Sequence, residues 1–195
     1  MKEINKYDAN FTAGGLLSSE FKSLYPILFE SNFIVQIEKE RELNNFLGIK
    51  TESARKRIVT EIKRRYNVVK KSFWEWFKDL SEKEQKLALF YLCLKTYPIV
   101  LDIHIEVALK KYKIGNDLNA FSVKMRLDEI ASVNDIVGSW SESTLDKLNS
   151  QYRTTLKECG LLKGERLSNH LIISDSFWEY FEDIGESWFK EVCFK

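Results

Sequence analysis

Lysine and arginine side chains gather in one short segment of this chain, and their chemistry is the clearest that the sequence offers. Between Lys50 and Lys71 there are nine of them: Lys50, Arg55, Lys56, Arg57, Lys63, Arg64, Arg65, Lys70 and Lys71. Only two acids, Glu52 and Glu61, lie among them, so the segment carries +7 in a protein whose total is +1. A positive charge this concentrated predicts a surface that faces a polyanion.

The same cations follow one side of a predicted helix over residues 52–66, which Thr51 would cap. At about 100° per residue, one side is apolar and holds Ala54, Ile58, Val59, Ile62 and Tyr66. The other side holds Ser53, Lys56, Arg57, Thr60, Lys63 and Arg64. Arg55 falls within the apolar arc, and we expect it to extend its head group to solvent or to an acid on another helix.

This pattern assigns a role to each candidate binding residue. Lys56, Arg57, Lys63 and Arg64 would neutralise phosphates, and Ser53 and Thr60 would offer hydroxyls to phosphates or base edges. Lys50 would approach the backbone at the start of the helix, where the helix dipole favours an anion. The alternative is an ordinary solvated helix face. Such faces mix charge signs at i,i+4, and the scarcity of acids here favours nucleic-acid contact.

Helices are predicted to position this basic segment. A helix over 33–43, a turn over 44–50 containing Gly48, and the basic helix form a helix-turn-helix-like pattern within a module of residues 1–71. Residues 72–195 would form a second helical module. It includes a helix over 144–159, which Ser143 would cap and Gly160 would end, and a small strand or wing near 167–173. A last, acidic helix over 176–193 carries an aromatic stripe of Phe177, Phe181, Ile184 and Trp188. The predicted fold class is mainly α.

Charge divides along the chain in the same way, because residues 1–71 sum to +5 and residues 72–195 to −4. The three cysteines are isolated, which argues for a reducing, cytoplasmic setting without a disulfide frame or a zinc site. The apolar stretch 87–109 is interrupted by charges, so we interpret it as a buried core helix and expect no membrane contact.

Catalytic patterns are missing from the sequence. His104 lies in an apolar helix and is expected to be a core histidine, and His170 has no nearby cysteine or acid. The chain contains no phosphate-loop, dinucleotide-binding, zinc-protease or nucleophile-elbow motif. We therefore expect a protein that is not an enzyme, with no cofactor, no metal and no small-molecule substrate.

Three blocks of residues follow one another along the chain. They are Phe11-Thr12-Ala13-Gly14-Gly15-Leu16-Leu17; Asn45-Phe46-Leu47 with Lys50-Thr51-Glu52-Ser53-Ala54-Arg55-Lys56-Arg57-Ile58 and Glu61; and Ser143-Thr144-Leu145 with Lys147-Leu148, closing on Leu156-Lys157-Glu158-Cys159-Gly160-Leu161-Leu162. In order and spacing, these blocks together resemble the BrxA family of the BREX bacteriophage-exclusion systems. The resemblance covers about residues 7–162. At one point the chain differs from the family, because Leu145 stands where the family usually has Arg.

The resemblance implies a small, mostly helical, non-enzymatic protein that binds double-stranded DNA, with Ser53 and the basic residues of the third helix near the phosphate backbone. The family has also been likened to NusB, an RNA-binding antitermination factor. From residues and resemblance together, we predict a DNA-binding component of a phage-defence system that can contact other BREX proteins. Two alternatives stay open: a scaffold whose basic face meets an acidic protein, and an RNA-binding protein.

Overall fold

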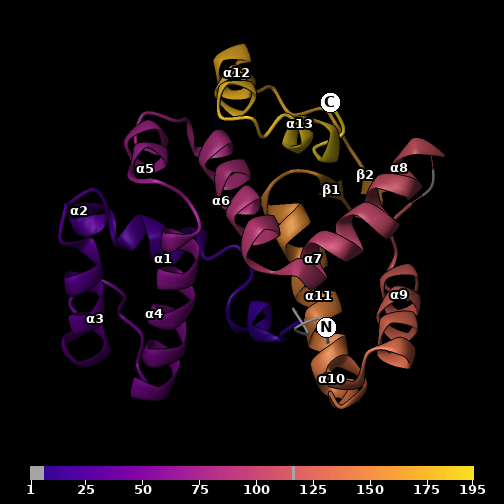
Figure 1. Cartoon of the computed structure of the whole chain (residues 1–195), viewed down its shortest axis with the longest axis horizontal. Coiled ribbons are helices and arrows are strands. Elements are labelled where there is room, and N and C mark those ends of the chain that lie inside the picture. The colour runs from indigo at the N-terminus through magenta and orange to yellow at the C-terminus, as the bar shows by residue number, and fades with distance from the viewer. Residues whose placement is uncertain (1–6, 116) are drawn as a thin grey trace, which may run out of the picture. The chain divides into compact units, whose positions relative to one another are not determined.

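The computed structural model describes residues 7–115 and 117–195 and confirms the mainly α fold class (Figure 1). The described strands are the antiparallel pair β1 (Leu162–Lys163) and β2 (Arg166–Leu167), with Leu162 opposite Leu167. A wing-like hairpin is therefore present, but it ends earlier than the predicted strand, because residues 168–174 have no regular structure.

The chain forms two compact units. The first, Ala13–Thr96, holds 16 Lys and Arg against 11 Asp and Glu and is called the basic unit below. The second combines Tyr97–Lys195 with the chain up to Thr12, holds 14 Lys and Arg against 18 Asp and Glu, and is called the acidic unit. The compact units divide the chain at 12/13 and at 96/97, whereas the predicted module boundary is at 71/72. The module boundary stays a prediction.

The basic unit contains α1 (Ser18–Ser23), α2 (Tyr25–Leu28), α3 (Phe33–Leu43), α4 (Glu52–Asn67), α5 (Lys71–Phe77) and α6 (Glu82–Thr96). Stacked rings join these helices, since Trp74 lies 5.5 Å from Phe21 and 5.0 Å from Tyr66, centroid to centroid. Phe33 completes the row at 4.5 Å from Tyr66. This aromatic row explains why α5 packs with α4 in one unit rather than starting a new one.

The segment Gly14-Gly15-Leu16-Leu17 packs against α4. A Cβ on Gly14 would lie 2.2 Å from a methyl carbon of Leu17, so any larger residue there would require the Leu17 side chain to move. The Leu16 carbonyl accepts a hydrogen bond at 3.0 Å from Nη1 of Arg65, whose side chain is fully buried. One of the nine cations that the sequence places in the basic segment therefore belongs to the core.

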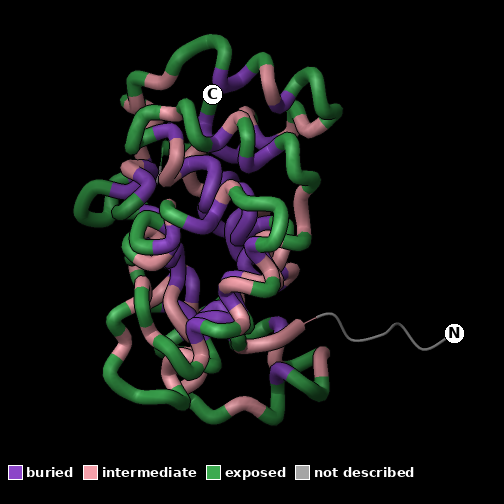
Figure 2. The backbone as a smooth tube through the Cα atoms, turned by 90° about the vertical axis from the view of Figure 1, so that its left-hand side faces the viewer, coloured by how far each residue is buried: buried purple, intermediate pink, exposed green. Residues whose placement is uncertain are grey.

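Local sequence signals in the basic unit are largely confirmed. The helix over Phe33–Leu43 is present as predicted, and Thr51 caps α4 by accepting a hydrogen bond from the Ala54 amide at 3.4 Å. Burial changes along the helices with the helical period (Figure 2). In α6, however, every residue from Leu87 to Leu94 is buried.

The acidic unit contains α7 (Pro98–Ile103), a π-helical turn η2 (His104–Leu109), α8 (Lys110–Lys113), α9 (Ala120–Val133), α10 (Asp135–Gly138), α11 (Glu142–Glu158), α12 (Asp175–Asp183) and α13 (Trp188–Val192). The short 3-10 helix η1 (Asn10–Ala13) spans the point in the sequence where the two units divide. His104 is a core residue, as predicted: its Nδ1 lies 2.8 Å from the Tyr152 hydroxyl and its Nε2 lies 2.8 Å from the Val192 carbonyl oxygen. Burial lowers the pKa of His104 to about 4.

Two predictions for the acidic unit are corrected. Ser141, not Ser143, caps α11, because its Oγ accepts the hydrogen bond from the Thr144 amide at 3.3 Å. The predicted last helix is two helices, since Gly185 adopts φ 75° between α12 and α13. The aromatic stripe therefore does not run straight: Phe177 and Phe181 are buried, whereas Ile184 is 45% exposed.

Candidate nucleic-acid interface

Helices α3 and α4 lie side by side as an antiparallel hairpin (Figure 1). Phe33 at the start of α3 contacts Tyr66 at the end of α4, while Arg41 near the end of α3 contacts Thr60 and Arg55. Contacts therefore run along the whole length of the pair. A helix-turn-helix motif usually has its helices crossed at about 90–120°, so the local geometry is that of an αα-hairpin, and the DNA-recognition role implied by the motif stays a prediction.

A buried carboxylate organises the turn between these helices. Glu40 is 2% exposed and accepts hydrogen bonds from the amides of Asn45, Phe46 and Leu47 at 3.0–3.2 Å. The Asn44 side chain adds a bond from the Ile49 amide at 3.0 Å. Backbone amides that would otherwise be unpaired are thereby satisfied, and the turn holds Lys50 and Thr51 at the start of α4.

Arg55 fixes the same turn from the α4 side. Its Nε donates to the Arg41 carbonyl at 3.0 Å, and its Nη1 donates to the carbonyls of Ile49 and Lys50 at 2.8 and 3.3 Å. The expected acid on another helix is replaced by three backbone oxygens. Arg55 therefore positions the interface and is not itself part of it.

The predicted binding residues lie together on the outer side of α4, but they differ in how open they are. Lys50, Ser53, Lys56, Arg57 and Thr60 are exposed, whereas the side chains of Lys63 and Arg64 are 29% and 31% exposed. The first half of α4 is thus the open part of the surface. We call this set of seven residues, Lys50, Ser53, Lys56, Arg57, Thr60, Lys63 and Arg64, the α4 surface.

Several members of the α4 surface already have partners within the chain. Lys56 pairs with Glu52, and hydrogen bonding from Lys56 lowers the pKa of Glu52. Arg64 pairs with the buried Glu61 at 3.1 Å. The Thr60 hydroxyl donates to the Lys56 carbonyl at 2.8 Å. The two acids in this segment therefore each pair with a cation of the same helix, at the i,i+4 and i,i+3 spacings.

Two residues that the sequence does not single out also take part, and both lie on α3. Glu38 forms ion pairs with Lys63 at 2.5 Å and with Arg41 at 2.8 Å, and Arg41 donates from Nη2 to the Thr60 hydroxyl at 3.1 Å. The mixed-charge run Glu38-Lys39-Glu40-Arg41-Glu42 is the only sequence signal for this network. Its pairing with α4 follows from the hairpin, not from any spacing within one helix.

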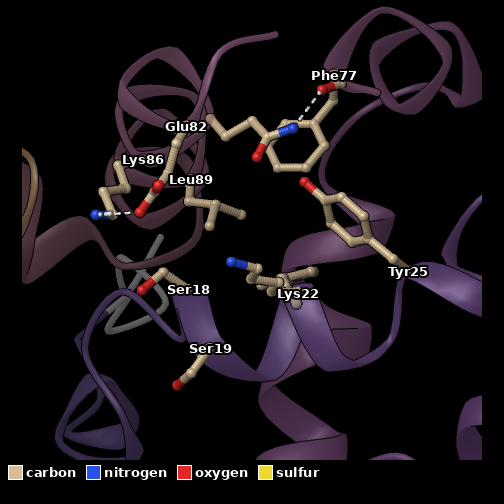
Figure 3. A pocket seen from close by; sticks show the side chains of 10 residues that line it. Ser18, Ser19, Lys22, Tyr25, Phe77, Glu82, Lys86 and Leu89 are labelled. Atoms are coloured by element: carbon tan, nitrogen blue, oxygen red, sulfur yellow. Dashed lines mark hydrogen bonds and ion pairs between the residues drawn. The ribbon is translucent and has the colours of Figure 1, made fainter. Parts of the chain in front are cut away.

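A separate cavity of about 230 Å³ lies elsewhere in the basic unit, among α1, α2, α5 and α6 (Figure 3). Figure 3 shows the Lys22 ammonium pointing into it, with Ser18 on one side and Tyr25 on the other. Glu82 and Lys86 pair at 2.9 Å on its wall, and Gln85 donates to the Phe77 carbonyl at 3.3 Å. Its lining residues offer hydrogen bonds but no nucleophile held against a base.

The described residues contain no group of three or more His, Cys, Asp or Glu side chains that could hold a metal ion. Over the same residues no single helix has the length and apolar character to cross a membrane, although the bent pair Glu82–Thr96 and Pro98–Lys113 passes on length and composition when taken together.

Comparison with known proteins gives the family. The model of the family described as BrxA matches residues 5–185, which is nearly the whole chain. The chain belongs to the BrxA family. A relative in Escherichia coli O9:H4 (strain HS), named "BREX protein BrxA", is 23% identical over 175 residues, which cover 87% of this chain and 80% of the relative. The resemblance seen in the sequence is thereby confirmed.

A solved structure shares the BrxA fold of this chain. It is the crystal structure of an uncharacterized protein from Magnetospirillum magneticum, which matches with a TM-score of 0.81 and 21% sequence identity over 96% of this chain and 98% of that one. At this identity the likeness concerns the fold alone.

The BrxA-like sequence blocks coincide with a close packing contact, a turn and a helix end. Phe11–Leu17 contains Gly14, which packs closely against the Leu17 side chain. Leu156–Leu162 closes α11 with a Schellman cap: the Leu161 amide donates to the Leu156 carbonyl at 2.9 Å, the Gly160 amide donates to the Lys157 carbonyl at 3.0 Å, and Gly160 adopts φ 76°. The second block, Asn45–Glu61, includes Arg55, which fixes the hairpin turn. Much of the family signal in this chain therefore encodes fold.

Proposed function

We propose that this BrxA-family protein is a non-enzymatic, double-stranded DNA-binding component of a BREX-type phage-defence system, acting in the cytoplasm without cofactor or small-molecule substrate. The observation that carries the proposal is the α4 surface: cations exposed on one side of a capped helix, within a unit of net charge +5. The name of the E. coli relative supports the assignment to a BREX system and makes other BREX proteins the natural partners.

Phosphate contact would begin at the open half of α4. Lys50, Lys56 and Arg57 are exposed there, and the Ser53 hydroxyl is exposed one residue beyond Glu52. The first amides of α4 are not bonded within the helix, so together with the helix dipole they favour an anion at this end. A duplex that docks here would be held mainly by its backbone, which predicts weak sequence preference.

Cationic side chains that are paired with acids of the same chain can still bind DNA phosphates. Exposed ion pairs contribute only about 0–1 kcal/mol, whereas each phosphate neutralised by a cation also releases counterions from the duplex. Lys56 can therefore exchange Glu52 for a phosphate, and Lys63 and Arg64 can follow at a greater cost because they are less exposed. Thr60 would contribute after leaving the Lys56 carbonyl.

An interaction subunit is the second candidate, and one observation favours it. In the acidic unit, Phe121, Met125 and Ile114 are 57–70% exposed, and a hollow of about 550 Å³ between η2, α8 and α9 includes Met125 and Ile114. Exposed apolar side chains of this size that cluster can mark protein contact sites. Co-purification of other BREX proteins that is lost in Phe121→Ser/Met125→Ser but kept in an α4-surface variant would favour this candidate.

The decisive test is a mobility-shift titration of the full chain with duplex DNA at several salt concentrations, with single-stranded DNA and structured RNA as parallel arms. If about five cations neutralise phosphates, log K should fall against log salt with a slope of roughly −4 to −5. Tighter binding to structured RNA than to duplex DNA would favour the NusB-like, RNA-binding alternative over the proposed DNA-binding function. No binding to any of the three at low salt would overturn nucleic-acid binding and leave the interaction role.

A further inference from the structure

Glu38 contacts two cations of the α3–α4 hairpin, Arg41 on its own helix and Lys63 on α4. Its two carboxylate oxygens meet different partners, Oε2 at 2.5 Å from Lys63 Nζ and Oε1 at 2.8 Å from Arg41 Nε. Glu38 and Lys63 are separated by 25 residues in the sequence, so the pair exists only because the helices are antiparallel. One carboxylate thus pairs both with Lys63, a member of the α4 surface, and with Arg41 on α3.

Solvent and anions can reach this contact. A surface hollow of about 500 Å³ is lined by Ile34, Val35, Glu38, Lys39, Glu42 and Lys63, and the side chains of Glu38 and Lys63 are 40% and 29% exposed. A phosphate that arrives at Lys63 therefore meets the Glu38 carboxylate at the same place. The carboxylate opposes it in two ways, by holding the cation and by repelling the anion.

We propose that Glu38 is a specificity-determining residue of the α4 surface, which withholds Lys63 and Arg41 from phosphate until a bound duplex displaces it. The inference rests on the proposed function. While Glu38 is paired with Lys63 and Arg41, a polyanion that binds nonspecifically contacts only the open half of α4. Arg41, which the sequence does not mark as a binding residue, becomes a phosphate contact once Glu38 releases it.

Glu42 supplies a matched control. It lies one helical turn from Glu38 on α3, is exposed, lines the same hollow, and has no ion pair among those found in the described part of the chain. Glu38→Gln and Glu42→Gln change the net charge equally, but only the first frees two cations. A difference between them therefore reports release of Lys63 and Arg41, not net charge.

The test is the same duplex titration on the wild type, Glu38→Gln and Glu42→Gln, with circular dichroism to confirm that each is folded. Glu38→Gln should bind about three- to tenfold more tightly than Glu42→Gln, because the duplex no longer has to displace a carboxylate from Lys63 and Arg41. In a Lys63→Gln background, most of that gain should disappear, which a double-mutant cycle measures.

The outcomes separate the two proposals. If the wild type binds duplex and Glu38→Gln gains no more than Glu42→Gln, the Glu38 role is overturned and the proposed function stands. If only Glu38→Gln binds, the Glu38 role is supported and the wild type is not a DNA-binding protein under those conditions. If neither binds at low salt, both proposals are overturned.

Discussion

Helices α4 and α11 share a frame but differ in the chemistry of their outer sides. Each begins after a hydroxyl cap, Thr51 or Ser141, and each cap accepts a hydrogen bond from the third amide that follows, at 3.4 and 3.3 Å. From the cap onward the first ten residues of each have the same order of exposed, intermediate and buried positions. Each packs against a preceding helix, α3 for α4 and α9 for α11.

The outer residues then diverge. Where α4 has Lys56 and Arg57, α11 has Asp146 and Lys147, and the next two exposed positions of α11 are the hydroxyl residues Ser150 and Thr154. The inner side of α4 buries the charged residues Glu61 and Arg65, whereas α11 buries Tyr152 and Thr155. The comparison teaches that the capped-helix frame is a property of the fold, and that function must be sought in the outer residues.

The contrast between α4 and α11 is tested most directly by removing positive charge from each helix in a separate variant. Replacing Lys50, Lys56 and Arg57 together by Gln should weaken duplex binding about a hundredfold or more and make the salt slope shallower by about 3, because three phosphate contacts are lost. The α11 variant Lys147→Gln/Lys157→Gln, which removes two exposed positive charges, should change affinity less than about twofold. Equal losses in mobility-shift titrations would mean that both helices meet DNA.

Lowering the pH should destabilise the acidic unit more than the basic unit, because both histidines, His104 and His170, lie outside the basic unit. The pKa of His104 is about 4 in the folded protein, against an ordinary value of 6.5. Its neutral form therefore stabilises the fold fully above pH 6.5. As the pH falls from 6.5 to 4, the unfolded chain binds a proton that the folded chain does not, and stability should drop by up to about 3 kcal/mol.

Denaturant titrations between pH 7 and pH 4 would measure this drop. Glu and Asp residues titrate in the same window, so the informative quantity is the difference from the wild type. His104→Gln should show a flatter pH dependence, while His170→Gln, which alters an exposed residue, should keep the wild-type curve. Parallel curves for wild type and His104→Gln would contradict the assignment.

Buried polar anchors offer a third contrast between the units. Glu40 holds three turn amides, whereas Asn149 on α11 donates one hydrogen bond, to the Ala120 carbonyl at 2.8 Å. Glu40→Ala should cost about 2–3 kcal/mol of unfolding free energy and Asn149→Ala about 1 kcal/mol. Chemical denaturation tests the order, and a smaller cost for Glu40→Ala would show that water replaces the carboxylate.

The smallest expected effects concern the two caps. Thr51→Ala and Ser141→Ala should each lower stability by about 1 kcal/mol, since each removes one side-chain acceptor from a helix start. Thermal unfolding should show similar shifts for both. Only Thr51→Ala should also alter duplex affinity, because it disturbs the end of α4 where phosphate contact is proposed. An identical affinity in the two variants would count against contact at that end.

Signals that act within a few residues of the chain were readable from the sequence. The cap at Thr51, the helix over Phe33–Leu43 and the stop at Gly160 depend on local backbone bonding and are present in the structure. The capping error at Ser143 has the same local nature, since Ser141 and Ser143 both precede α11 and only the backbone geometry distinguishes them. The position of a cationic side on α4 was likewise predictable from helical periodicity.

Contacts between distant residues were beyond the sequence. Lys63 and Glu38 are 25 residues apart, Arg65 and Leu16 are 49 apart, and His104 and Val192 are 88 apart. The sequence by itself determined the helical class, the family and the charge of the basic segment, because period, composition and caps are local. Only the tertiary structure decided which cations are open, which are held by acids of α3 and which are buried, because pairing along the hairpin depends on how helices pack.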